Sequence, residues 1–190
     1  MGLVNVFAYV LVLFIILLAI RSRKVRIPQM ISHWHHLTEN LQESSKDFYT
    51  SIEGAVASRN LKEIKLSRVN FHEGGFLSAE REYLRVIRRE QIFDICAAPY
   101  GNGFFISWWF GEELDWRLRI ISAIPFLGPW LVSVFKPLTY YRLDTALMFQ
   151  ESIRKAILEV LGERTQAKGL QSLSENESKP IMMDFFAKMR

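Results

Sequence analysis

Cys96 is the residue whose chemistry would be most direct if this chain were an enzyme. It is the single cysteine among 190 residues, and Asp94 lies two positions before it, so both side chains would share one face of a strand. With His72 in the same predicted sheet, these residue types suit a nucleophilic set in which a base activates the thiol. A lone cysteine between Ile95 and Ala97 more often acts as a small buried hydrophobic residue. We therefore keep an enzyme that uses Cys96 or His72 as a third hypothesis and expect a non-enzymatic protein.

Two histidines near the start of the chain have a spacing that suits metal ligands on a helix. His33 and His36 lie one helical turn apart, and Glu39 lies one turn further. No fourth ligand is in view, so we interpret them as solvated histidines near an anionic membrane surface. The sequence contains no phosphate-binding loop and no dinucleotide-binding, kinase, zinc-finger, hydrolase or calcium-loop pattern. We expect no metal and no cofactor.

A basic cluster follows one predicted strand and its turn, and it consists of Arg81, Arg85, Arg88 and Arg89. Guanidinium groups bind phosphate, so a shared surface would suit the headgroups of anionic lipids. The alternative, which we favour, is ion pairing with neighbouring glutamates together with plain solvation. Asp94 is a carboxylate in an apolar strand and needs a partner, which Arg85 of the neighbouring strand can supply. We expect no nucleic-acid partner, because no recognition motif is present.

The elements that must position these residues begin with residues 1–21, which we predict to be a transmembrane anchor. Residues 3–20 form an uncharged apolar run of about 18 residues, enough to cross a hydrocarbon core of about 30 Å. The basic residues Arg21, Arg23, Lys24 and Arg26 follow this run, whereas a cleaved signal peptide would carry them before it. The alternative is a buried core helix, which this abrupt basic edge disfavours. The positive-inside rule then predicts a cytoplasmic location for the rest of the chain, and the single cysteine agrees with a reducing compartment.

The predicted sheet is preceded by residues 22–60, for which we expect a juxtamembrane amphipathic helix because apolar residues recur at near-helical spacing. Residues 61–116 then predict an antiparallel sheet of about four strands. Its clearest part is residues 92–110, two apolar runs joined by a glycine- and asparagine-containing turn that strongly favours a β-hairpin. The second run is apolar at nearly every position, so that strand needs cover on both faces.

A second hydrophobic segment occupies residues 117–137, and its uncharged core is interrupted by two prolines and a glycine. Basic residues flank both of its ends, and Trp116 and Trp130 suit a membrane interface. We expect a membrane-seeking helical hairpin that dips into the inner leaflet; a buried soluble hairpin and a second membrane span are the alternatives. Residues 138–169 predict an amphipathic helix that packs on the sheet, and residues 170–190 predict a tail with a short helix.

The expected fold is therefore α+β: an N-terminal transmembrane helix, a small antiparallel sheet of about four strands flanked by helices, and a second hydrophobic hairpin, re-entrant or interfacial. Hydrophobic residues make up 49% of the chain and its net charge is +4, so disorder of the whole chain is excluded. The leading hypothesis is a membrane-anchored cytoplasmic interaction or scaffold module that holds a protein partner or a homo-oligomer. The alternative is a protein that binds or acts on lipid headgroups.

Overall fold

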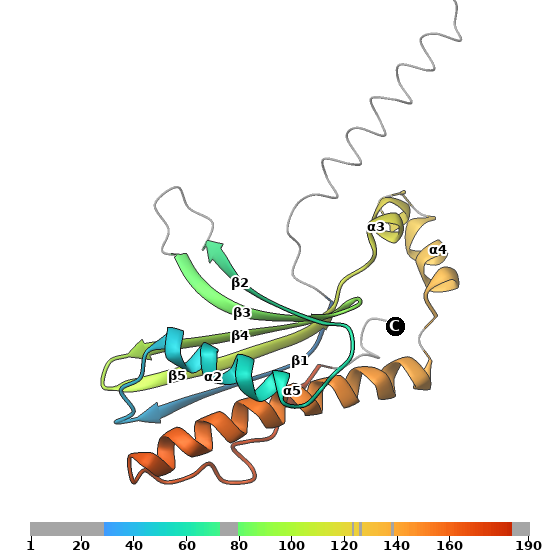
Figure 1. Ribbon diagram of the computed structural model, residues 1–190. Coiled ribbons are helices and arrows are strands. Elements are labelled where there is room, and N and C mark those ends of the chain that lie inside the picture. The colour runs from blue at the N-terminus through green and yellow to red at the C-terminus, as the bar shows by residue number, and fades with distance from the viewer. Residues whose placement is uncertain (1–28, 73–79, 123, 126, 138, 184–190) are drawn as a thin grey trace, which may run out of the picture. The chain divides into compact units, whose positions relative to one another are not determined.

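Six antiparallel strands form one sheet in the computed structural model, which describes residues 29–72, 80–122, 124–125, 127–137 and 139–183 (Figure 1). The strand order is β2-β3-β4-β5-β1-β6, so the first strand lies between β5 and β6. The elements follow one another as β1 (Gln29–Glu39), α2 (Ser45–Ala57), β2 (Ile64–His72), β3 (Glu80–Arg88), β4 (Gln91–Tyr100), β5 (Gly103–Glu112), α3 (Trp116–Ser122), α4 (Gly128–Phe135), α5 (Tyr140–Ala167) and β6 (Ile181–Met182). They group into two compact units: the sheet with α2 and most of α5, and residues 114–143 with α3 and α4.

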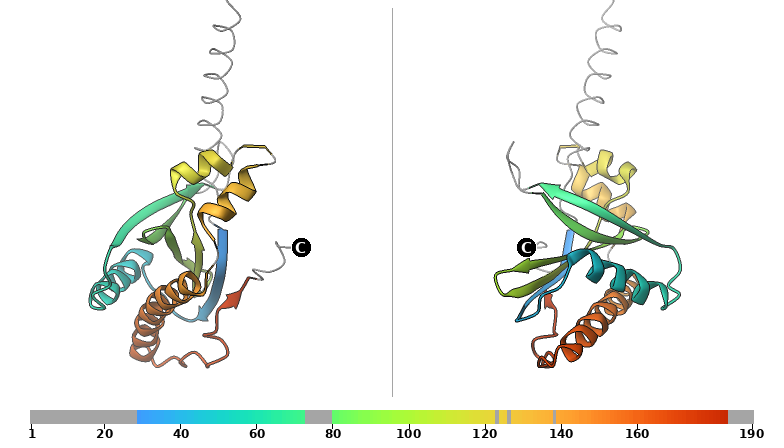
Figure 2. Two further views of the ribbon diagram at one scale, coloured as in Figure 1. Left: turned by 90° about the vertical axis from the view of Figure 1, so that its right-hand side faces the viewer. Right: turned by 60° about the vertical axis from the view of Figure 1, so that its left-hand side comes forward.

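Two helices, α2 and α5, cover one face of the sheet, and the hydrophobic core lies between these helices and the strands (Figure 2). Phe48 of α2, Phe149 of α5 and Phe93 of β4 are all members of this buried cluster. Burying a side chain of this size stabilises the fold by about 1.5–3 kcal/mol. A buried polar contact also ties α5 to β1, because the Ser32 hydroxyl donates to Gln150 Oε1 at 2.8 Å. The long C-terminal helix is thus held both by apolar packing and by a specific hydrogen bond.

The predicted hairpin of residues 92–110 is confirmed as β4 and β5. The two strands pair along their whole length, from Gln91 with Glu112 to Tyr100 with Gly103. Gly101 takes a φ of +58° in the tight turn, a conformation that L side chains rarely adopt. The turn chemistry and the strand pairing therefore agree with the sequence pattern.

β3 and β4 pair over only part of their length. Their ladder ends at Leu84 and Ile95, although both strands continue beyond this pair. Tyr49 of α2 bridges the two strands where they separate: its hydroxyl donates to the Glu82 carbonyl at 2.8 Å and accepts from the Ala97 N–H at 2.9 Å. Burial raises the pKa of Tyr49 well above its ordinary value, so the hydroxyl remains a donor.

The amphipathic helix predicted over residues 22–60 is wrong for residues 29–39, which form β1, whereas α2 is helical as expected; residues 22–28 lie outside the described residues. Ile31 and Trp34 suggested a helical period because they lie three residues apart. The pairing of β1 with β5 shifts register between Met30 and Ser32. The side chains of Ile31 and Trp34 are both buried in the core. A bulge changes the face of every residue that follows it, so a bulged strand can imitate the spacing of a helix.

The sheet is also larger than the predicted four strands, because β1 and β6 extend it at one side. β6 lies where a short helix was predicted within residues 170–190. Ile181 and Met182 pair with β1 instead, and the Met183 N–H donates to the Ile31 carbonyl at 2.9 Å. The edge of β1 has backbone N–H and C=O groups that a helix in the tail would leave without partners. Residues 181–182 form a strand because a strand can pair with these groups.

The α+β class is confirmed, but the membrane architecture predicted with it is corrected. Across the described ranges, no helix combines the length and the apolar composition that crossing a membrane requires. α3 and α4, which lie in the segment predicted as a re-entrant or interfacial hairpin, have seven and eight residues, too few for either to span a membrane. The transmembrane helix assigned to residues 1–21 and its basic flank at Arg21, Arg23, Lys24 and Arg26 lie outside the described residues. The fold is a six-stranded antiparallel sheet with helices.

Candidate functional site

α3 and α4 form a short helical hairpin in the unit of residues 114–143. Gly128 begins α4, and a Cβ atom at this position would lie 2.6 Å from the Ile121 carbonyl oxygen, so only glycine permits this close approach. Pro129 follows, and its fixed φ and missing N–H suit the first turn of a helix. The segment predicted at 117–137 is therefore a helical hairpin, and its contact with lipid stays a prediction.

The hairpin is largely apolar in sequence, and yet several of its large side chains are exposed. None of the side chains of α3 is buried. More than half of the surface of five large apolar side chains is open to solvent, and these five define what we call the hairpin surface: Trp116 at 61%, Leu127 at 58%, Trp130 at 62%, Val134 at 54% and Phe135 at 65%. Exposed apolar side chains that gather on one small element mark an interaction site more often than chance.

Basic residues accompany the hairpin surface. Residues 114–143 contain four basic side chains and one acidic side chain, a net charge of +3. The Arg117 guanidinium lies over the Trp116 ring at 5.4 Å from its centroid, a cation–π arrangement. Arg142 donates to the Pro137 carbonyl at 2.8 Å, and Arg119 Nε donates to the Leu114 carbonyl at 2.9 Å. Backbone carbonyls thus fix Arg119 and Arg142, and Arg117 lies against an exposed apolar side chain.

The face of the sheet opposite α2 and α5 contains the Asp94 carboxylate, and its expected partner is confirmed. Arg85 donates from Nε to Oδ1 at 2.7 Å and from a terminal nitrogen to Oδ2 at 2.8 Å, a bidentate pair. The hydrogen bond to Asp94 raises the pKa of Arg85. The pair lies beside Trp109, which is the strand partner of Asp94 on β5. The Arg85 guanidinium therefore forms an ion pair within the molecule.

The other arginines of the predicted basic cluster do not gather with Arg85 on one surface. Arg81 has the same strand parity as Arg85 and shares its face, as expected. Arg88 has the opposite parity, and Arg89 lies in the following turn, where its Nε contacts Glu63 at 2.6 Å. A headgroup site that uses all four side chains would need them on one side of the sheet, so the described geometry favours ion pairing.

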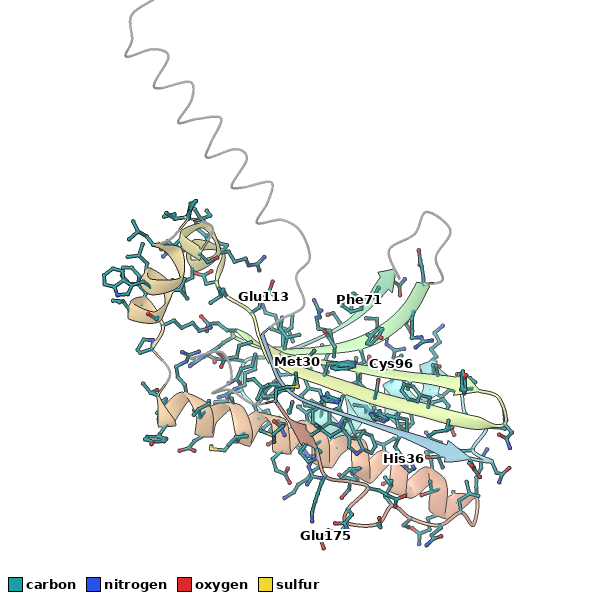
Figure 3. All side chains as sticks on the ribbon, turned by 180° about the vertical axis from the view of Figure 1, so that it is seen from behind. Met30, His36, Phe71, Cys96, Glu113 and Glu175 are labelled. Carbon is teal, nitrogen blue, oxygen red and sulfur yellow. The ribbon has the colours of Figure 1, made fainter. Side chains whose placement is uncertain are left out.

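Cys96 lies on β4, an interior strand of the sheet, with 1% of its surface exposed (Figure 3). Burial raises the pKa of its thiol, although Arg81 opposes this effect, and the thiol has hydrogen-bond partners that include Tyr83. A protonated, buried thiol is a poor nucleophile. Asp94 is held by an arginine, and His72 ends β2, which β3 separates from the strand of Cys96. The predicted nucleophilic set is therefore not assembled.

The histidines proposed as metal ligands lie on a strand, where alternate residues point to opposite faces. His33 stacks on Trp109 with ring centroids 4.9 Å apart. His36 lies on the opposite face of the sheet and stacks on Trp34, with ring centroids 6.0 Å apart. Burial lowers the pKa of His36, and nearby Glu177 partly opposes this. In the part of the chain that the structure describes, no group of three or more histidine, cysteine, aspartate or glutamate residues is arranged to hold a metal ion.

Sequence reasoning singled out Trp116 and Trp130 and did not single out the other members of the hairpin surface. Leu127, Val134 and Phe135 stand in an uncharged run in which every position looks equally apolar. The signal that could have found them is the composition of α4, which has no charged residue and therefore no polar face to turn to water.

No protein-family model, no curated protein and no solved structure matches this chain. The function must therefore be argued from its own residues, and the hairpin surface is the feature with the clearest chemistry.

Proposed function

We propose that this chain is a non-enzymatic interaction or scaffold module that works at a membrane, with its sheet unit on the cytoplasmic side. The single observation that carries the proposal is the hairpin surface, in which large apolar side chains on α3 and α4 remain more than half exposed. The lone, buried Cys96 is compatible with a reducing compartment. The sheet unit would hold a protein partner or a second copy of the chain.

The energetics favour lipid as the contact of this surface. Removing the exposed half of one such side chain from water contributes roughly 0.8–1.5 kcal/mol, so five side chains contribute roughly 4–8 kcal/mol. That is comparable with the reversible membrane binding of a single acyl chain. Tryptophan also prefers the boundary between hydrocarbon and water, because its ring is apolar and its N–H is polar. Two short helices lying in the interface satisfy both requirements without crossing the bilayer.

A site-specific fluorophore tests the lipid contact in the full-length chain. An environment-sensitive dye on Val134→Cys, in a Cys96→Ala background, should shift to the blue in vesicles and be quenched by brominated acyl chains. The matched control is Leu66→Cys, an exposed apolar position on edge strand β2. If the dye at position 134 behaves like the dye at position 66, the hairpin stays in water and the membrane proposal fails.

The interaction role needs a separate measurement. Proximity labelling from the full-length chain in cells should return a reproducible protein partner, or the chain should run as an oligomer in mild detergent. A monomer in detergent with no reproducible partner would remove the scaffold role and leave the lipid contact standing.

A further inference from the structure

Residues 114–143, which bear the hairpin surface, have an excess of basic side chains. The whole chain has a net charge of +4, and residues 114–143 alone have a net charge of +3. Asp115 is the one acidic residue of this unit. The described residues of the sheet unit have the opposite balance, with 14 basic and 17 acidic side chains, and some of its arginines meet acidic partners, as Arg85 meets Asp94 and Arg68 meets Glu53. Charge and exposed apolar area therefore coincide on one element.

Two of the basic side chains of this unit, Arg142 and Arg117, are positioned by contacts within the unit. Arg142 donates to two successive carbonyls after α4, those of Lys136 at 3.3 Å and Pro137 at 2.8 Å. Arg117 is more exposed and stacks over Trp116, which belongs to the hairpin surface. Groups that are already ordered lose less entropy when they bind an anion, so their binding is stronger.

We propose that the hairpin surface recognises anionic phospholipids, an inference that rests on the proposed function and specifies its ligand. The apolar side chains enter the acyl boundary, and the guanidinium and ammonium groups beside them meet the phosphates at headgroup level. Positive charge complements an anionic leaflet, and it does not complement a neutral one. The contact is electrostatically selective as well as hydrophobic.

The test uses the full-length chain with the dye at Val134→Cys and phosphatidylcholine vesicles that contain rising fractions of phosphatidylglycerol. The blue shift should grow with the anionic fraction and shrink as salt is added. The variant Arg117→Gln with Lys136→Gln should weaken the apparent lipid affinity about 30-fold, from the contribution of two basic residues near an anionic surface. The control variant Arg81→Gln with Arg88→Gln removes two charges from the sheet and should leave the affinity within about twofold, since these residues lie outside the hairpin.

The outcomes separate this inference from the function on which it rests. An equal blue shift with neutral and anionic vesicles would overturn the selectivity and leave the membrane contact intact. No shift with either vesicle would overturn both. A loss of affinity in the Arg81→Gln, Arg88→Gln control alone would move the anionic site to the sheet and overturn the assignment. A blue shift that appears without lipid and rises with protein concentration would assign the hairpin surface to a second copy of the chain. That result would also overturn the recognition of anionic phospholipids.

Discussion

The ion pair of Arg85 and Asp94 should contribute strongly to stability, because it is both bidentate and shielded. The Asp94 side chain is 10% exposed and that of Arg85 is 18% exposed. Removing one member of a fully buried pair costs about 3–5 kcal/mol, because the other charge stays buried without compensation. Arg85 retains some contact with water and lies over the Phe71 ring, so Asp94→Leu should cost about 3 kcal/mol. For a chain of this size the melting temperature would fall by about 6–12 °C.

A double-mutant cycle tests the reasoning through urea unfolding of the full-length chain, followed by tryptophan fluorescence. The variants are Asp94→Leu, Arg85→Leu and the combination, and the combination should be less destabilised than the sum by about 2 kcal/mol. The matched control is the pair of Arg89 and Glu63, whose nitrogen and oxygen are 2.6 Å apart but whose side chains are 70% and 53% exposed. That pair should show little coupling, because water screens it. Equal coupling in both cycles would refute the idea that shielding decides the strength of the first pair.

Three further predictions concern other parts of the molecule. Tyr49→Phe removes the hydroxyl that bridges β3 and β4 and should destabilise the fold by about 2 kcal/mol in urea unfolding; an unchanged midpoint would show that water replaces it. Gly128→Ala would place a Cβ atom 2.6 Å from the Ile121 carbonyl, so α3 and α4 must separate, and amide exchange should accelerate in these helices and not in the sheet. Burial lowers the pKa of His36 against the opposing effect of Glu177, so the unfolded chain takes up the proton first and stability should fall as pH drops below about 6.5. His36→Gln should flatten this decline between pH 7.5 and 5.5, and an identical slope in both proteins would contradict the assignment.

Local sequence signals predicted those parts of the fold that depend on near neighbours. The hairpin of β4 and β5 follows from a glycine-containing turn between two apolar runs, and both parts lie within twenty residues. The amphipathic pattern of residues 138–169 likewise predicts α5, since a helix repeats its own period. The partner of Asp94 could be inferred because β3 and β4 are consecutive strands. In each case the deciding contacts are close along the chain.

The candidate site could be predicted only in part. Trp116 and Trp130 stand out as residue types, and the basic flanks of the hairpin are visible in the sequence. Strand parity in the sequence already separates Arg88 from Arg81, and Arg85 could be paired with Asp94, but the sequence did not show that Arg89 would contact Glu63. Arginines that are close in the sequence can lie on opposite faces of a strand or in its turn, so closeness in the sequence does not show that they form one site.

The sequence by itself determined the α+β class, the β4–β5 hairpin, the long amphipathic helix and the basic, apolar character of residues 117–137. Only the tertiary structure decided that β1 is a strand, because its partner β5 lies far along the chain and a bulge disguises its period. Only the tertiary structure decided that several large apolar side chains of α3 and α4 stay exposed. The physical reason is the same in both cases: local propensity is a weak term, and the pairing or packing partners that override it are set by the whole chain.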